Sequence, residues 1–142
     1  MIPLPDGHYA YIQYILWHPD MGSLVRVFDR TTSEPLSSAG ALAGVGDLFG
    51  PVFVGLSSPV NRGRWKLIGS LPVKEQPFPR FRATSATKPG SYDNWWIWDG
   101  QTEVPIGRLP SKLRSLERRA LWGDEALEQR IATGIDPFEG VQ

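Results

Sequence analysis

The chain has 142 residues, the size of one ordinary domain, and we expect a single domain spanning residues 1–142. It has no cysteine, which excludes disulfides, thiolate metal sites and cysteine nucleophiles. The formal net charge is zero, but residues 1–59 sum to −3, residues 60–120 to +7 and residues 121–142 to −4. A basic middle suits nucleic acid or an acidic protein partner, unless the flanking acids fold back and neutralise it.

The N-terminal part of the chain predicts a β-hairpin and a further strand. Residues 8–17, HYAYIQYILW, are rich in aromatic and β-branched side chains, which favour a strand that is covered on both faces. The Asp-Gly pair at residues 6–7 is typical of a tight turn, so residues 2–4 should form the other strand of the hairpin. A second turn at residues 18–22 leads into a strand at residues 24–28.

The middle of the chain alternates loops with short strands. Residues 29–50 carry no sustained strand pattern and predict a loop with a short helix. Strands are expected at residues 52–56 and 65–71, because turn residues separate these two runs. Three prolines keep residues 71–81 extended, as a connector or an edge strand.

Residues 94–100, NWWIWDG, predict a strand that turns at Asp-Gly into a second strand at residues 102–106. Alternate side chains of a strand point to opposite faces, so the three tryptophans are divided between the two faces of this hairpin. One face must be core, and the other is either covered by a second layer or exposes a tryptophan to a partner. The faces carry Trp95 with Ile97 and Trp96 with Trp98.

After residue 110 the spacing of apolar residues changes from two towards 3.6, which predicts two short helices. The first would run from Ser111 to Gly123 and the second from Asp124 to Gly134. Such short helices do not persist alone in water, so each should pack on the sheet or on the other. The expected fold class is α+β: a β-rich twisted antiparallel sheet or partly open barrel with two short C-terminal helices.

Residue types that carry catalysis are present but scattered. His8 and His18 would lie about 33 Å apart at opposite ends of one strand, so they cannot share a site. The carboxylates Asp93, Asp99 and Glu103 flank a single hairpin, where acidic turn residues are common without catalysis. A hydrolase is therefore only a third interpretation. We expect no enzyme, with no catalytic set, no metal and no cofactor.

A basic and aromatic run crosses the middle of the chain. Cations that track phosphates, interleaved with rings that stack on bases, are typical of single-strand nucleic-acid grooves. The same pattern fits a half-buried strand, which makes nucleic acid the less favoured partner. A nucleic-acid or carbohydrate-binding module with this aromatic-basic surface is the alternative function. The residues are Arg62, Arg64, Lys66, Arg80 and Arg82, with Trp65, Phe78 and Phe81.

Three stretches of the chain form a combination that is more specific than any one of them. They are IPLPDGHYAYIQYIL at residues 2–16, RWKLIGSLPVKEQPFPRF at residues 64–81, and WIWDG at residues 96–100 with LPSKLRSLERRALWGDEALEQRIATG at residues 109–134. Together they resemble the immunity protein 26 family of bacterial polymorphic toxin systems. The resemblance implies a non-enzymatic cytoplasmic immunity protein that binds a cognate toxin domain and neutralises it by stoichiometric occlusion.

The composition agrees with a cytoplasmic protein that has no membrane partner. No apolar run approaches the roughly 20 residues that cross a bilayer. The start of the sequence, MIPLPDG, also lacks the basic and apolar parts of a signal peptide.

Under this resemblance the toxin contacts are expected around the aromatic strand and the basic turn, since Trp, Tyr and Arg dominate protein interfaces. Family members usually begin with a further Gly-Asp-hydrophobic segment ahead of Ile-Pro-Leu, whereas here Ile-Pro-Leu follows Met1 directly. Either the start of the sequence was placed late or a first strand is lacking. A missing first strand would leave an exposed sheet edge, and a homodimer through that edge is a further hypothesis. The expected contact residues are Trp96, Trp98, Tyr92, Asp93, Arg62 and Arg64.

Overall fold

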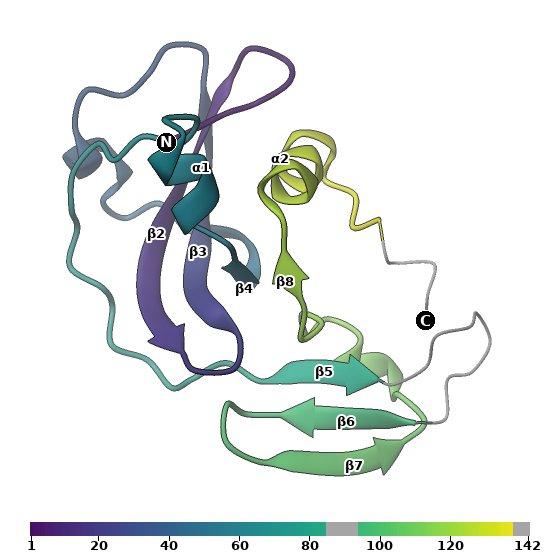
Figure 1. Ribbon diagram of the computed structural model, residues 1–142. Coiled ribbons are helices and arrows are strands. Elements are labelled where there is room, and N and C mark those ends of the chain that lie inside the picture. The colour runs from purple at the N-terminus through teal and green to yellow at the C-terminus, as the bar shows by residue number, and fades with distance from the viewer. Residues whose placement is uncertain (85–93, 138–142) are drawn as a thin grey trace. The chain divides into compact units, whose positions relative to one another are not determined.

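A computed structural model describes residues 1–84 and 94–137 of the chain (Figure 1). The chain divides into two compact units, and each is described by itself below. Unit 1 comprises residues 1–75 and 121–134, and unit 2 comprises residues 76–120 and 135–142. The expected β-rich fold class is confirmed, because the described residues form eight strands and only a few short helices. No helix in these ranges is long and apolar enough to cross a membrane.

Unit 1 is built on a curled sheet of five strands in the order β1-β2-β3-β4-β8. The strands β1 to β4 run antiparallel to one another in sequence, and β8 runs parallel to β4. Register shifts interrupt both the β2–β3 and the β3–β4 pairs, and such bulges bend a sheet and increase its twist (Figure 1). The bounds are β1 (Ile2–Pro3), β2 (Tyr9–His18), β3 (Gly22–Thr32), β4 (Asp47–Val54) and β8 (Leu121–Trp122).

The predicted N-terminal hairpin is confirmed in unit 1. Ile2 lies opposite Ala10, and the connecting turn is stabilised by the Asp6 carboxylate, which accepts a hydrogen bond from the His8 backbone N–H at 2.9 Å. Gly7 takes a φ of +88°, a value that glycine adopts without the strain it imposes on other residues. The second predicted turn, at residues 18–22, also joins two paired strands, β2 and β3.

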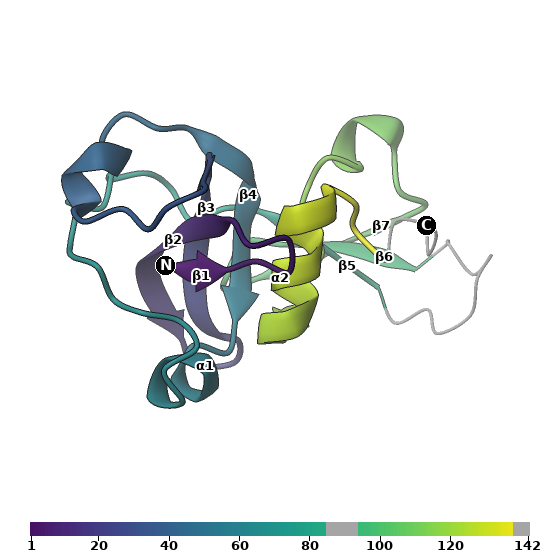
Figure 2. The ribbon, with the colours of Figure 1, turned by 90° about the horizontal axis from the view of Figure 1, so that it is seen from above.

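Both faces of the curled sheet are covered by other parts of unit 1. The helix α2 (Asp124–Thr133) lies on one side, and the short 3-10 turn η1 (Ala39–Leu42) lies on the other (Figure 2). The first core contains Ile2, Leu4, Ala10, Val25, Val27, Val52, Val54, Trp65, Trp122, Leu127 and Ile131. The second contains Tyr11, Phe28 and Leu42, with Met1, Tyr9, Leu36, Val45, Ile68 and Leu71 packed against it.

Two predictions for the middle of unit 1 are wrong in detail. The strand β4 begins at Asp47, inside the expected loop, and a short helix α1 (Ser57–Asn61) follows it. Residues 65–71 form no strand, because only Trp65, Lys66 and Leu71 have backbone hydrogen bonds to other described segments, and these bonds do not make a ladder. In a strand, Trp65 and Leu67 would lie on the same face. Because no ladder forms, Trp65 is buried whereas Leu67 is exposed.

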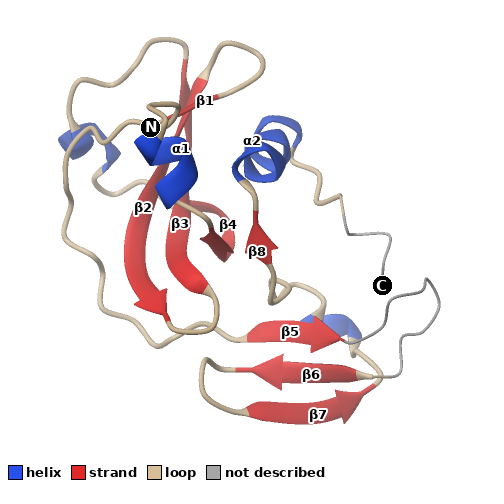
Figure 3. Cartoon of the chain, in the orientation of Figure 1, coloured by secondary structure: helices blue, strands red, loops and turns tan. Residues whose placement is uncertain are grey.

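Unit 2 contains a three-stranded antiparallel sheet in the order β5-β6-β7 (Figure 3). Its strands are β5 (Phe81–Thr84), β6 (Trp95–Trp98) and β7 (Glu103–Gly107). The predicted hairpin of residues 94–106 is therefore confirmed, with Trp98 opposite Glu103. Its turn is held by the Asp99 carboxylate, which accepts hydrogen bonds from the backbone N–H groups of Gln101 and Thr102 at 3.0 and 2.8 Å.

Of the two predicted C-terminal helices, only the second is an α-helix. It is α2, and it ends at Gly134, which has a φ of +73°. The first is reduced to a 3-10 turn, η2 (Ser111–Leu113). Residues 117–119 run beside β5 instead: Arg82 N–H donates to the Glu117 carbonyl at 2.9 Å, and Arg119 N–H donates to the Arg82 carbonyl at 2.8 Å. These backbone bonds to a sheet edge prevail over a weak local helix preference.

Candidate functional site

The tryptophans of β6 are mostly core. Trp98 is only 5% exposed, and its ring centroid lies 5.7 Å from those of both Phe78 and Phe81. The guanidinium of Arg119 lies 5.3 Å from the centroid of the Trp98 ring. Trp98 therefore presents no free face, whereas Trp96 is half-buried. Two further predicted contacts, Tyr92 and Asp93, lie outside the described residues.

Several members of the basic run are buried rather than open to a nucleic acid. Arg82 is buried, its Nε donates to the Leu116 carbonyl at 2.9 Å, and its guanidinium lies 5.5 Å from the centroid of the Trp95 ring. Burial, and then the neighbouring Arg118 guanidinium, lowers the pKa of Arg82. Trp65 and Phe81 are also buried, so neither ring has a face on which a base or a sugar could stack.

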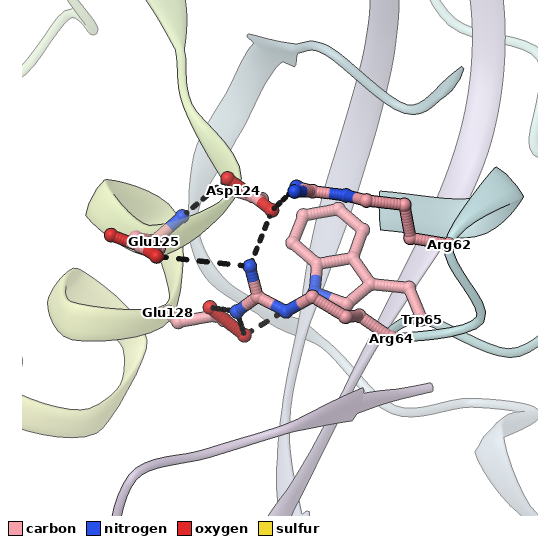
Figure 4. A network of polar contacts seen from close by, with 6 residues as sticks. All are labelled: Arg62, Arg64, Trp65, Asp124, Glu125 and Glu128. Atoms are coloured by element: carbon pink, nitrogen blue, oxygen red, sulfur yellow. Dashed lines mark hydrogen bonds and ion pairs between the residues drawn. The ribbon is translucent and has the colours of Figure 1, made fainter. Parts of the chain in front are cut away.

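The two predicted contact arginines of unit 1 bind acidic residues of α2 (Figure 4). Arg64 donates to Asp124 Oδ2 at 2.8 Å and to both carboxylate oxygens of Glu128, at 2.5 and 3.0 Å. Arg62 is 59% exposed and lies 3.3 Å from the same Asp124 oxygen. Trp65 Nε1 donates to Glu128 at 3.4 Å.

This cluster of arginines and carboxylates stabilises the fold. It fastens the first turns of α2 to the segment after α1, and acidic residues at a helix N-terminus are also favoured by the helix dipole. The acids of the C-terminal segment thus neutralise part of the basic middle, one of the two outcomes that the charge pattern left open. Arg64 is committed to this contact, and only Arg62 keeps a largely exposed guanidinium.

A different surface of unit 1 has the properties of a binding site: two adjoining apolar hollows. The first has a volume of about 280 Å³ and lies between the strand β2 and the segment 66–71. Four consecutive residues of β2 line this hollow. Because consecutive side chains of a strand point to opposite faces, the hollow follows the strand and is not confined to one face of the sheet. Its lining comprises Met1, Tyr11, Ile12, Gln13, Tyr14, Phe28, Ala39, Leu42 and residues 66–71.

The second hollow has a volume of about 200 Å³ and shares a wall with the first. Three large apolar side chains on its lining are exposed to solvent: Leu67 at 90%, Tyr14 at 49% and Val60 at 46%. The two hollows share Met1, Ile12, Tyr14, Lys66 and Leu67, and Ile2, Leu56, Val60 and Trp65 complete the second. Exposed apolar side chains gathered around a depression are typical of protein-binding surfaces. We call this surface the double hollow.

The double hollow is walled by a segment held at both ends. At one end the Met1 amino group donates to the Lys66 carbonyl at 2.7 Å, and Lys66 N–H donates to the Met1 carbonyl at 3.0 Å. At the other end Gln13 Nε2 donates to the Leu71 carbonyl at 2.8 Å. Burial lowers the pKa of the Met1 amino group. The wall therefore keeps its position without a strand ladder.

The sequence pattern did not reveal the double hollow. Alternation places Leu67 on the same face as the buried Trp65, and only the tertiary structure shows that the strand is absent there. The one available signal was local: an apolar run, Leu67 and Ile68, followed directly by glycine and serine.

The residues considered for chemistry stay apart. His8 and His18 lie at opposite ends of β2, as predicted, and His8 lies 3.3 Å from Asp6. Glu103 forms an ion pair with Arg119 at 2.5 Å, and Asp99 holds its own turn. In residues 1–84 and 94–137, no three acidic or histidine side chains gather closely enough to hold a metal ion.

Comparison with known proteins places the chain among immunity proteins. Residues 1–93 match the family model described as Immunity protein 26, and because this match covers more than half of the sequence, the chain belongs to the immunity protein 26 family. The match includes the first two of the three stretches that resemble the family. No curated protein and no solved structure matches the chain.

Proposed function

We propose that this protein binds a cognate bacterial toxin of a polymorphic toxin system and neutralises it by stoichiometric occlusion. Family membership over residues 1–93 carries the proposal. The exposed apolar residues of the double hollow support it, because such residues are typical of protein-binding surfaces. A stable complex needs a complementary surface of about 800 Å² per partner and no catalytic residues. The toxin would be made by the same cell or delivered by a neighbour, and the protein would act in the cytoplasm.

Of the contacts expected from the sequence, Arg62 and Trp96 remain candidates. Arg62 is largely exposed and holds one long contact with Asp124, so it can turn to a partner at little cost. Trp96 is half-buried on β6, whereas its neighbour Trp98 is not accessible.

The test uses the toxin domain encoded by the neighbouring reading frame. Co-expression should protect a host from that domain. Titration of the purified toxin should reach complete inhibition at one molecule of this protein per molecule of toxin. Trp96→Ala should weaken the inhibition while the variant stays folded, as a cooperative melting transition would show.

Substoichiometric inhibition would contradict occlusion. If one molecule of this protein inactivated many toxin molecules, and if replacing His8 or His18 removed that turnover, the protein would be an enzyme. A steep loss of oligonucleotide affinity with added salt would instead favour the nucleic-acid alternative.

A further inference from the structure

We propose that the double hollow receives an extended segment of the partner protein that carries two large apolar side chains and a nearby carboxylate. The inference rests on the proposed function, since the partner is the toxin of that proposal. It goes further by naming the surface and the chemistry of the segment that fits it.

The size of the hollows argues for side chains rather than a small molecule. Small-molecule sites usually have volumes of about 300 to 1,000 Å³ and enclose most of the ligand. The two hollows, at about 280 and 200 Å³, lie at or below the lower end of this range, and Tyr14 and Leu67, which line both hollows, are exposed to solvent. An apolar side chain in each would cover these exposed residues, as the central anchors of protein interfaces do.

The charge of the double hollow indicates a second property of the partner. Lys66 is exposed and lines both hollows, and its ammonium group forms no ion pair with any described residue. Of the residues that the structure describes, no Asp or Glu lines either hollow. A partner that covers this surface removes water from the Lys66 ammonium group, which costs binding free energy. The partner would therefore bind less tightly unless it supplied a hydrogen-bond acceptor to that group. A carboxylate beside the apolar anchors meets that need.

The backbone of the wall favours an extended segment. Among the described residues, none makes a hydrogen bond to the residues 67–70, although both flanking residues are bonded. Unpaired backbone groups on an exposed stretch are a template for a strand from another chain. Because the wall is already fixed at Lys66 and Leu71, little ordering entropy remains to be lost on binding.

The centre of the wall packs closely on η1. Gly69 has a φ of +154°, and a Cβ at this position would lie 3.0 Å from the Cβ of Ala39 in η1. Both Gly69 and Ala39 line the first hollow, so this close packing forms part of its surface.

The test compares single substitutions in the complete protein, with the purified toxin domain of the neighbouring reading frame as the probe and calorimetric titration as the readout. Leu67→Asp should weaken binding at least about 30-fold, because it puts a charge at the apolar anchor point. Leu121→Asp is the matched control, since Leu121 is 61% exposed in the same unit but lies outside both hollows; it should change the affinity less than about twofold.

The charge is tested separately. Lys66→Glu should weaken binding about tenfold, and Lys66→Met should weaken it less. A photoreactive p-benzoylphenylalanine at position 67 should cross-link a toxin peptide that contains apolar residues and an acid, whereas the same group at position 121 should not. Circular dichroism melting of each variant checks that the fold is retained.

The outcomes separate the two proposals. If the wild-type protein neither binds nor inhibits the toxin domain, the proposed function fails and the inference fails with it. If the wild type binds but Leu67→Asp and Lys66→Glu bind equally well, only the inference is overturned. It is also overturned if Leu67→Asp converts a dimer into a monomer without affecting the toxin, because the occupant would then be a second copy of this chain.

Discussion

Glu128 is a buried carboxylate on α2, and its environment depends on one neighbour. Its side chain is 7% exposed, and it accepts two hydrogen bonds from Arg64 and one from Trp65. A carboxylate removed from water is costly unless a cation and hydrogen-bond donors compensate it. The stability of the α2 attachment should therefore be sensitive to Arg64.

Arg64→Ala should reduce the free energy of unfolding by about 3 kcal/mol, at the lower end of the range for breaking a buried pair because Arg64 is itself partly exposed. Urea denaturation measures the change. Arg62→Ala is the control and should cost less than about 0.5 kcal/mol, because its contact with Asp124 is long and exposed. Equal losses in the two variants would show that the burial of Glu128 does not decide the effect.

Asp99 gives a pH-dependent prediction at the same scale. Hydrogen bonds from the Thr102 backbone, and then the Gln101 backbone, lower the pKa of its carboxyl group below the ordinary value of 3.8. The charged form is thus favoured in the folded state, and the contribution to stability is present above pH 3.8 and lost as the pH falls through the lowered value.

Asp99→Asn should therefore lower the melting temperature at pH 7, and the difference from the wild type should shrink in acid below both pKa values. Melting curves across this pH range measure it, and a carboxyl ¹³C NMR titration reports the pKa of Asp99 directly. A difference that stayed constant from pH 7 into acid would contradict the role of the charged carboxylate.

At the scale of elements, the β6–β7 hairpin shows why an Asp-Gly turn was a reliable signal. Gly100 has a φ of +98°, and an added Cβ would lie 2.8 Å from the ring of Phe78. Both the backbone conformation and the packing of the turn thus require glycine. The signal is local, so the sequence was enough to predict it.

Gly100→Ala should destabilise unit 2 by about 2 kcal/mol, the combined cost of a left-handed backbone and an overpacked contact. Gly44→Ala is the matched control, because Gly44 has a φ of +79° but nothing within 4 Å of the added Cβ. It should show only the backbone strain, about 1 kcal/mol. Thermal unfolding of both variants measures the two parts, and equal losses would contradict the clash with Phe78.

Predictions for other elements were wrong where a distant partner decided the outcome. Residues 65–71 have strand composition, but among the described residues only Trp65, Lys66 and Leu71 have backbone bonds to other segments, so no ladder forms. Residues 111–122 have helical spacing, yet residues 117–119 bond to β5 and residues 121–122 pair with β4. Short segments yield to such pairings because their local preference is weak.

At the scale of the whole molecule, unit 1 is completed only by the end of the chain. The strand β8 and the helix α2 supply Trp122, Leu127 and Ile131 to its first core, after the chain has passed through unit 2. Arg130 adds to this contact, with its guanidinium 3.7 Å from the centroid of the Phe49 ring.

A chain ending at Ala120 should therefore lose the cooperative unfolding of unit 1, whereas a chain ending at Gly134 should keep it. The reason is that only the first truncation removes the three core side chains, whose burial contributes several kcal/mol. Tryptophan fluorescence during urea denaturation distinguishes the two. A cooperative transition in the shorter chain would contradict the assignment of β8 and α2 to the core.

The single domain expected over residues 1–142 stays a prediction. It requires one thermal transition in the intact protein, with equal calorimetric and van't Hoff enthalpies. The homodimer through a sheet edge likewise stays a prediction, and light scattering at high concentration tests it.

Features that depend on neighbouring residues follow from the local sequence. Turn chemistry, alternation over long strands and the glycine stop of α2 predicted both hairpins and the last helix, and the quoted stretches indicated the family. Long-range packing decides which arginines are already paired, which tryptophans are buried and where an apolar surface remains exposed. These properties depend on residues far apart in the sequence, from Phe78 with Trp98 to Arg64 with Asp124 and Met1 with Lys66, and no local pattern encodes such contacts.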